Sequence, residues 1–355
     1  MKITINSQAL GTELRVLNKI VPSKPVIPVL SHILFTADSQ LQLYATDLEV
    51  GLTTPCEARI DEPGTMALPA AKLLSMVERF PDSDMTLATD KQQGRITCGA
   101  FRSNMQVLPA EDFPQPSPVE GTAFSIEGSA LRWLISKAKH AVSTEASRGI
   151  LQGALLNVAG STAALVATDS KRLTLATVAG SGADTKIVIP SKTLDLLEKL
   201  LEDSSISITV GERHLFFEVG KRLLTSRTID GQFPAYERIV PRNNDKVVQL
   251  DRVAWTAALQ RVVLAAEEHG ATWFSISPGS MLMQATSASV GAAEESNAVG
   301  YEGEPLEILV NAHYVLDFLE VCAEPTVTML LKDASSAALL QDGRDCFAVI
   351  MLMRA

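Results

Sequence analysis

The residue types that most often carry catalysis or bind metal ions are present in this sequence, but they do not cluster. The five histidines are spread along the chain, and none stands at ligand spacing from a cysteine or a carboxylate; they are His32, His140, His214, His269 and His313. No glycine-rich phosphate loop, nucleophile elbow or paired-histidine motif occurs. The sequence therefore predicts no catalysis, no metal site and no cofactor.

Two short acidic segments come closest to a metal site. Asp47 with Glu49, and Asp169 next to Thr168, each follow an apolar strand-like run and offer oxygen atoms of the kind that Mg²⁺ binds. An aspartate that follows a threonine at the end of a strand more often accepts hydrogen bonds from the backbone of a turn. We therefore predict that both aspartates cap turns, with a magnesium site as the less favoured alternative.

The same two segments reveal an internal repeat. Residues 45–49 and 167–173 both begin Ala-Thr-Asp, and their threonines are 168 − 46 = 122 residues apart. A third Ala-Thr pair follows at 285–286. Only the middle copy continues as Ser170-Lys171-Arg172-Leu173, which indicates that this copy has acquired a binding role.

The elements around these segments recur with the same period. Each repeat is predicted to hold two helices and about eight short alternating strands, such as 41–44, 206–210 and 214–219. Apolar stripes at helical spacing predict the first helices, which contain Leu10-Leu14-Leu17-Val21, Leu131-Leu134-Ala138-Ala141 and Val253–Ala266. The second helices are predicted to run from Leu68 to Phe80, Ile189 to Leu201 and Val310 to Cys322. With Phe113-Pro114 and Phe233-Pro234 near the ends of two repeats, we predict three like domains, 1–120, 121–245 and 246–355.

The composition is that of an ordinary globular protein. The chain has 355 residues, which favours two or three domains, with 46% hydrophobic and 20% charged residues. The four scattered cysteines have neither disulfide nor metal spacing, so we expect them to be reduced and buried; they are Cys56, Cys98, Cys322 and Cys346. No signal-peptide core is present, and the apolar run 346–353 is too short to span a bilayer. A cytoplasmic protein without membrane contact is expected.

Six segments in their order along the chain resemble the bacterial DNA polymerase III β subunit, the family of replicative sliding clamps. They are residues 24–30, 45–49, 108–114, 167–173, 230–236 and 351–354, and the resemblance covers Met1 to Ala355. It implies an α+β fold of three repeated clamp-type domains, each with two helices packed on antiparallel β-sheets. It further implies a head-to-tail ring homodimer, a processivity factor that encircles double-stranded DNA without reading its sequence.

The resemblance also implies a pocket between domains 2 and 3 that takes short linear motifs from partners. The implied partners are the clamp loader, the replicative and other DNA polymerases, ligase and mismatch-repair proteins. The pocket residues are Leu151, Thr168, Ser170, Lys171, Arg172, Leu173, Pro234, Arg238, Ile239, Asn311, Tyr314, Ile350, Met351, Leu352, Met353 and Arg354. Core packing is the alternative for Leu151, Leu173 and Ile239, and a final edge strand is the alternative for the tail.

This chain departs from the family pattern within the pocket. Ser170-Lys171 stands where Gly-His is common, Leu352 where proline is common, and Ala355 where a larger apolar residue is familiar. These departures leave the pocket in place and bear on which motifs it prefers.

The charge distribution permits DNA in the ring. The net charge is −10, yet the six predicted helical windows sum to +2, which leaves −12 for the rest of the chain. The two windows of the third domain are acidic and fit this arrangement less well. The DNA-facing candidates are Lys24, Arg132, Arg148 and Lys192. The alternative is that these charges only solvate amphipathic helices.

The resemblance places the ring seam at Ser103 and Met105 on one side and at Leu264 and Ala265 on the other. Because Ser103 and Ala265 stand where bulkier apolar residues are often found, the sequence predicts a seam that is less apolar than usual. A different class of function is also open, namely a three-domain peptide-binding scaffold that does not encircle DNA.

Overall fold

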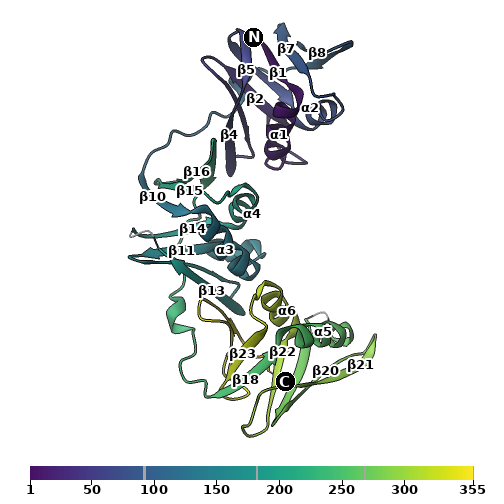
Figure 1. Ribbon diagram of the computed structural model, residues 1–355, viewed down its shortest axis with the longest axis vertical. Coiled ribbons are helices and arrows are strands. Elements are labelled where there is room, and N and C mark those ends of the chain that lie inside the picture. The colour runs from purple at the N-terminus through teal and green to yellow at the C-terminus, as the bar shows by residue number, and fades with distance from the viewer. Residues whose placement is uncertain (91–92, 181–182, 268, 355) are drawn as a thin grey trace. The chain divides into compact units, whose positions relative to one another are not determined.

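The computed structural model describes residues 1–90, 93–180, 183–267 and 269–354 (Figure 1). The chain folds into two compact units, the first made of Met1–Glu127 with Glu202–Thr228 and the second of Gly128–Leu201 with Ile229–Ala355. The predicted second domain contributes to both units because its first strand and its last three strands join a sheet of the first unit.

The described residues contain six short α-helices in three pairs, and the two helices of each pair pack together. The pairs are α1 (Ser7–Leu17) with α2 (Ala70–Val77), α3 (Gly128–Ala138) with α4 (Ser191–Leu200), and α5 (Arg252–Val262) with α6 (Ala312–Val321). Short 3₁₀ segments follow two of the first helices, η3 (Lys139–Ala141) after α3 and η6 (Val263–Ala265) after α5. The predicted helices are therefore confirmed, with the difference that Val21 lies beyond α1 and Ala141 lies in η3.

The strands of the described residues form four antiparallel sheets. The first unit holds a five-stranded sheet, in the order β5 (Ala58–Glu62), β1 (Lys2–Asn6), β7 (Asp84–Asp90), β8 (Gln93–Cys98), β9 (Phe101–Gln106). It also holds an eight-stranded sheet, in the order β10 (Thr122–Glu127), β15 (Ser205–Val210), β16 (His214–Val219), β17 (Arg222–Arg227), β4 (Val50–Cys56), β3 (Leu41–Thr46), β2 (His32–Ala37), β6 (Gly64–Pro69).

The second unit repeats this combination. Its eight-stranded sheet has the order β14 (Asp184–Pro190), β11 (Gly153–Ala159), β12 (Thr162–Thr168), β13 (Arg172–Ala179), β25 (Cys346–Ile350), β24 (Ala338–Asp342), β23 (Thr326–Leu331), β18 (Lys246–Asp251). Its four-stranded sheet has the order β21 (Gly291–Ala298), β20 (Ser280–Ser287), β19 (Ala271–Ser277), β22 (Leu306–Asn311).

Residues of two kinds precede the helices, namely polar residues that cap the first turn and prolines. The side chains of Asn6, Asp251 and Asn311 accept hydrogen bonds from backbone amides in the first turns of α1, α5 and α6. Helices α2 and α4 instead begin directly after Pro69 and Pro190. Of these residues, Pro69, Pro190 and Asn311 stand at the spacing that indicated the repeat in the sequence.

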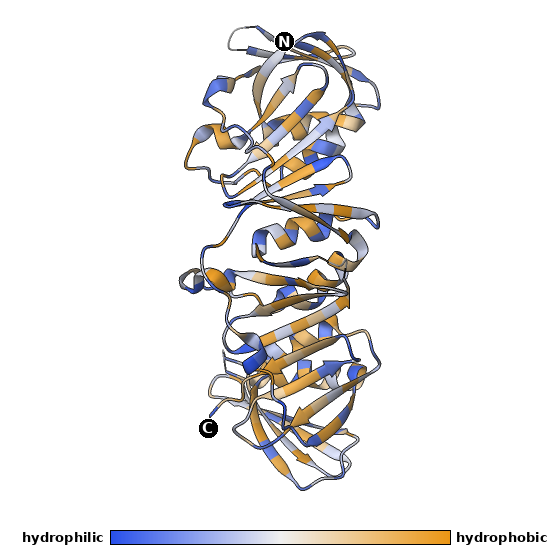
Figure 2. Cartoon of the chain, turned by 90° about the vertical axis from the view of Figure 1, so that its left-hand side faces the viewer, coloured by the Kyte–Doolittle hydropathy of each residue, from blue (hydrophilic) through white to orange (hydrophobic). Residues whose placement is uncertain are grey.

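The core comes from apolar residues that recur along strands and on one side of each helix (Figure 2). All four cysteines are buried and free, as predicted. Burial raises the pKa of Cys56 to about 11 and that of Cys346 to about 12, so both stay neutral thiols at neutral pH. Within the described residues, no helix combines the length and apolar character needed to cross a membrane.

Two sheets continue from one predicted domain into the next. In the first unit β17 pairs with β4, and in the second unit β25 pairs with β13. Each joint therefore gains a ladder of main-chain hydrogen bonds, which covers two strand edges that would otherwise be open.

Candidate functional site

The turn between β12 and β13 is organised by Thr168 and Asp169. The Thr168 hydroxyl donates to the carbonyl oxygen of Arg172 at 2.6 Å. One Asp169 carboxylate oxygen accepts from the amides of Lys171 and Arg172, both at 2.9 Å. Ser170, which lies between Asp169 and Lys171, has a positive φ of 75°, a strained conformation for a residue other than glycine.

The turn between β3 and β4 has the same geometry. Thr46 donates to the carbonyl oxygen of Val50 at 2.9 Å, and Asp47 accepts from the amides of Glu49 and Val50 at 3.0 and 2.8 Å. Leu48 has a φ of 77° and so matches Ser170. The prediction that both aspartates cap turns is confirmed.

Replacing Asp169 by alanine is expected to lower the free energy of unfolding by about 1–2 kcal/mol, because two amides of the turn lose their acceptor. Asp169→Asn keeps an acceptor oxygen and should lose less. Urea unfolding followed by tryptophan fluorescence measures both. A Mg²⁺-dependent rise in the melting temperature of the wild type that Asp169→Ala removes would instead support the magnesium alternative.

Arg172 is the first residue of β13, directly after this turn, and four groups hold its side chain in place. Its guanidinium pairs with Asp169 at 3.1 Å and with Asp317 of α6 at 2.5 Å, and donates to the carbonyl oxygen of His140 at 2.7 Å. The same group lies 4.5 Å from the ring centre of Tyr314. A side chain with so many partners is fixed in place, so Arg172 is a rigid part of the site.

Two of these partners were not identified from the sequence. Asp317 stands three residues after Tyr314, and this spacing puts both on one side of α6, which is a signal the sequence contains. No pattern in the sequence indicated that His140 contacts Arg172. Burial, followed by the nearby charge of Arg172, lowers the pKa of His140 to about 4, so its ring is neutral at neutral pH.

The C-terminal tail is attached to the same turn. Strand β25 ends at Ile350, which pairs with Arg172. Beyond it the Met351 amide donates to the carbonyl oxygen of Lys171 at 3.0 Å, and the Met353 amide donates to that of Leu309 at 2.8 Å. The edge-strand alternative is wrong, because β25 lies between β13 and β24 and the tail leaves the sheet. Ala355 lies outside the described residues.

The apolar candidates divide into buried and exposed ones. Leu173 and Ile350 are each 1% exposed, and Leu173 packs with Tyr236 in a core cluster, as the core-packing alternative for it describes. Leu151 is also buried. By contrast Ile239 is 42% and Met351 46% exposed, and these two supply accessible apolar surface.

The remaining pocket candidates differ in burial and in contacts. Asn311 caps α6, Tyr314 faces Arg172, and the side chains of Arg238 and Arg354 are exposed. Pro234 is exposed, and its carbonyl oxygen accepts from the Tyr236 amide at 2.8 Å. Leu352 and Met353 are half-buried. Their roles in binding stay predictions.

The DNA-facing candidates have different surroundings. Lys24 is exposed, and Arg132 donates to the carbonyl oxygen of Leu201. Arg148 pairs with Glu145 at 2.9 Å and donates to the Ser170 hydroxyl at 2.9 Å. Lys192 is half-buried, and burial lowers its pKa. Their contact with DNA stays a prediction.

The charge count along the helices needs correction at three positions. Lys137 is buried and pairs with Asp342 at 2.9 Å. Glu13 is buried as well and pairs with Arg222 at 3.0 Å. Lys139 pairs with Asp195 and Glu198, so it is not a free cation. The windows counted these charges as facing solvent because a sequence does not show which partner each one meets.

Three family models match consecutive parts of the chain. They describe the N-terminal domain of the DNA polymerase III beta subunit at residues 1–117, its central domain at 125–235 and its C-terminal domain at 237–354. The chain belongs to the DNA polymerase III beta subunit family. The three like domains predicted from the repeat and the clamp-type fold implied by the resemblance are confirmed, and the boundaries at 120 and 245 stay predictions.

Relatives of this clamp match over their full lengths. A Pseudomonas putida protein named Beta sliding clamp is 34% identical over 366 residues, with all of both chains covered. The crystal structure of the DNA polymerase III subunit beta from Pseudomonas aeruginosa is similar with a TM-score of 0.96 and 33% identity, again over all of both chains. A structure of a sliding clamp from the same species bound to griselimycin gives a TM-score of 0.94 and 34% identity, also over all of both chains.

Proposed function

We propose that this chain is a DNA sliding clamp, a processivity factor of which two copies close head-to-tail into a ring around duplex DNA. The observation that carries the proposal is the ordered match of all three clamp domains along the chain. The ring acts by topology and positioning, without catalysis, metal or cofactor. Its place of action is the cytoplasm, where bacterial DNA is replicated.

The site around Arg172 is the place where partner peptides bind. Exposed Ile239 and Met351 offer apolar contact, and Arg172, held in place by four groups, offers a rigid side chain beside them. An extended segment also needs backbone partners, and Ser170 and Met351 are exposed here. Polymerases, the clamp loader, ligase and mismatch-repair proteins would compete for this site. The griselimycin complex of a relative supports ligand binding by this family.

Retention on circular DNA tests the topological part of the proposal. The chain is loaded onto nicked circular DNA by a clamp loader with ATP, washed in moderate salt, and the DNA is then cut once. A ring stays on the circle and slides off the linear form. Equal retention before and after cutting would contradict encirclement and support the scaffold alternative.

A further inference from the structure

Two departures from the family pattern stand in the turn that holds the C-terminal tail. Ser170 and Lys171 occur where glycine and histidine are common. Ser170 has a φ of 75°, which glycine adopts without strain, and such strain is kept mainly where a residue has a function. The Ser170 hydroxyl accepts a hydrogen bond from Arg148 at 2.9 Å, a contact that glycine cannot make.

The backbone of Lys171 is fixed at both of its polar groups. Its amide donates to Asp169 at 2.9 Å, and its carbonyl oxygen accepts from the Met351 amide at 3.0 Å. Lys171 is exposed, and Met351 is 46% exposed. A residue that carries an accessible cation is therefore hydrogen-bonded to a residue that carries accessible apolar surface.

The carboxylates near Lys171 are engaged with other cations. Asp169 pairs with Arg172 at 3.1 Å, and Glu145 pairs with Arg148 at 2.9 Å. The hydrogen bond from Arg148, the charge of Arg148 and the charge of Lys171 together hold the pKa of Glu145 below its usual value. Within the part of the chain that the structure describes, the Lys171 ammonium group has no hydrogen bond and no ion pair.

The other basic residues of the site divide in the same way. Arg172 offers little free charge to a ligand, because Asp169 and Asp317 both pair with it. Arg238 and Arg354 are exposed, and no described residue forms an ion pair with either of them. The unpaired charges of the candidate pocket residues are thus positive, in a chain whose net charge is −10. A complementary ligand carries negative charge.

Resting on the proposed function of this site, we propose that Lys171 selects partner peptides in which an aspartate or glutamate stands within two residues of an apolar side chain. The apolar side chain packs on Met351, and the carboxylate pairs with Lys171. This spacing is within reach, because one residue of extended chain advances about 3.3 Å and the lysine stem has four carbons. The phosphate groups of DNA are also negative, but they bring no apolar side chain to Met351.

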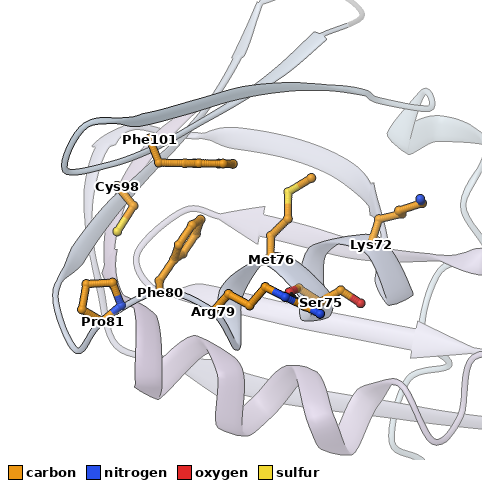
Figure 3. A pocket seen from close by; sticks show the side chains of 8 residues that line it. All are labelled: Lys72, Ser75, Met76, Arg79, Phe80, Pro81, Cys98 and Phe101. Atoms are coloured by element: carbon orange, nitrogen blue, oxygen red, sulfur yellow. Dashed lines mark hydrogen bonds between the residues drawn. The ribbon is translucent and has the colours of Figure 1, made fainter.

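A pocket of the first unit also combines apolar and basic side chains (Figure 3). Met76, Phe80 and Phe101 surround a cavity of about 600 Å³, with Lys72 in its lining. Its chemistry would suit an acidic apolar peptide as well. Lys72 is therefore the matched control for Lys171, since both are exposed lysines next to apolar side chains.

A library of fluorescein-labelled octapeptides tests the selection. Each peptide holds two leucines and one phenylalanine, with either Asp or Asn at each other position, and binding to the full chain is followed by fluorescence anisotropy. The tightest peptide is expected to contain Asp. The same peptide with Asn in place of that Asp should bind the wild type about three- to fivefold more weakly, as for an exposed ion pair.

Variants of the chain show which lysine reads the acidic residue. Lys171→Ala should bring the affinities of the two peptides within about 1.5-fold of each other, because the ion pair is lost. Lys171→Glu should make the Asn peptide the tighter one, because like charges then meet. Lys72→Ala should keep the wild-type preference, and circular dichroism checks that all three variants fold. A preference that survives Lys171→Ala, or that Lys72→Ala removes, would overturn the inference.

The outcomes for the wild type separate this inference from the proposed peptide site. If no peptide of the library binds, the peptide site itself is contradicted. If Asp and Asn peptides bind equally well, only the role of Lys171 is contradicted. A Lys171→Ala variant that keeps the preference but is retained less well on circular DNA would assign this lysine to DNA contact instead.

Discussion

Replacing Met353 and Arg354 together by alanine is expected to abolish stimulation of a replicative polymerase while the chain remains a dimer. The backbone of the tail is fixed at the Met353 amide, so the two side chains project from a held segment next to the site. Met353 is half-buried and adaptable, and Arg354 is exposed and charged, a combination suited to peptides of differing sequence. Primer extension on a primed single-stranded circle measures the effect.

The matched control removes an apolar and a basic side chain elsewhere. Val119→Ala with Arg213→Ala changes two exposed residues outside the second unit and should preserve stimulation. Sedimentation of both double variants shows whether the dimer persists. Full stimulation by the tail variant would refute the role of the tail, and loss of the dimer would show that the tail acts on assembly instead.

The helices and strands were predictable because local chemistry determines them. Pro69, Pro190 and Asn311 mark helix starts that the structure confirms, and Leu10 and Leu131 mark the buried sides of first helices. Helix ends were placed a few residues too late, as at Val21. The ends depend on where tertiary contacts stop supporting the helix, and a hydrophobic stripe does not show this.

The site was predictable only in part. The Thr168–Arg172 turn follows from a local motif, so its cap was identified from sequence alone. The partners of Arg172 lie on other elements, and no local pattern pairs His140 with a residue so far along the chain. The turn after Thr286, in the third repeat, also shows the limit of reasoning from a repeat. Thr286 pairs with Ala292 across a longer loop than the one that joins Thr168 to its partner Leu173.

Buried ion pairs are the feature that sequence reasoning missed most clearly. Glu13 meets Arg222 next to the β4–β17 joint, and Lys137 meets Asp342 next to the β13–β25 joint. A buried ion pair adds little net stability compared with apolar packing, but it penalises any arrangement that separates its members. Each joint thus has a charge pair that favours one way of docking the two domains.

Lys137→Ala is therefore expected to lower the free energy of unfolding of the second unit by about 3–5 kcal/mol at neutral pH, because Asp342 is left buried without its cation. Burial raises the pKa of Asp342, but hydrogen bonds from the Glu324 amide and from Lys137 outweigh it and hold the pKa below its usual value. The carboxylate thus stabilises the fold above its ordinary pKa of 3.8, and this contribution is lost as the pH falls through the folded value. The difference in the free energy of unfolding between Lys137→Ala and the wild type should therefore shrink as the pH falls through that value.

Tryptophan fluorescence isolates this transition, because all three tryptophans, at positions 133, 255 and 273, belong to the second unit. Lys186→Ala removes an exposed lysine from the same unit and should change the free energy by less than about 0.5 kcal/mol. Lys137→Met with Asp342→Leu removes both charges and should recover much of the loss, since no charge then remains unpaired. If the double variant were as unstable as Lys137→Ala, the lost free energy of unfolding would come from lost packing around the lysine side chain. The Lys137–Asp342 ion pair would then not determine how the two domains dock.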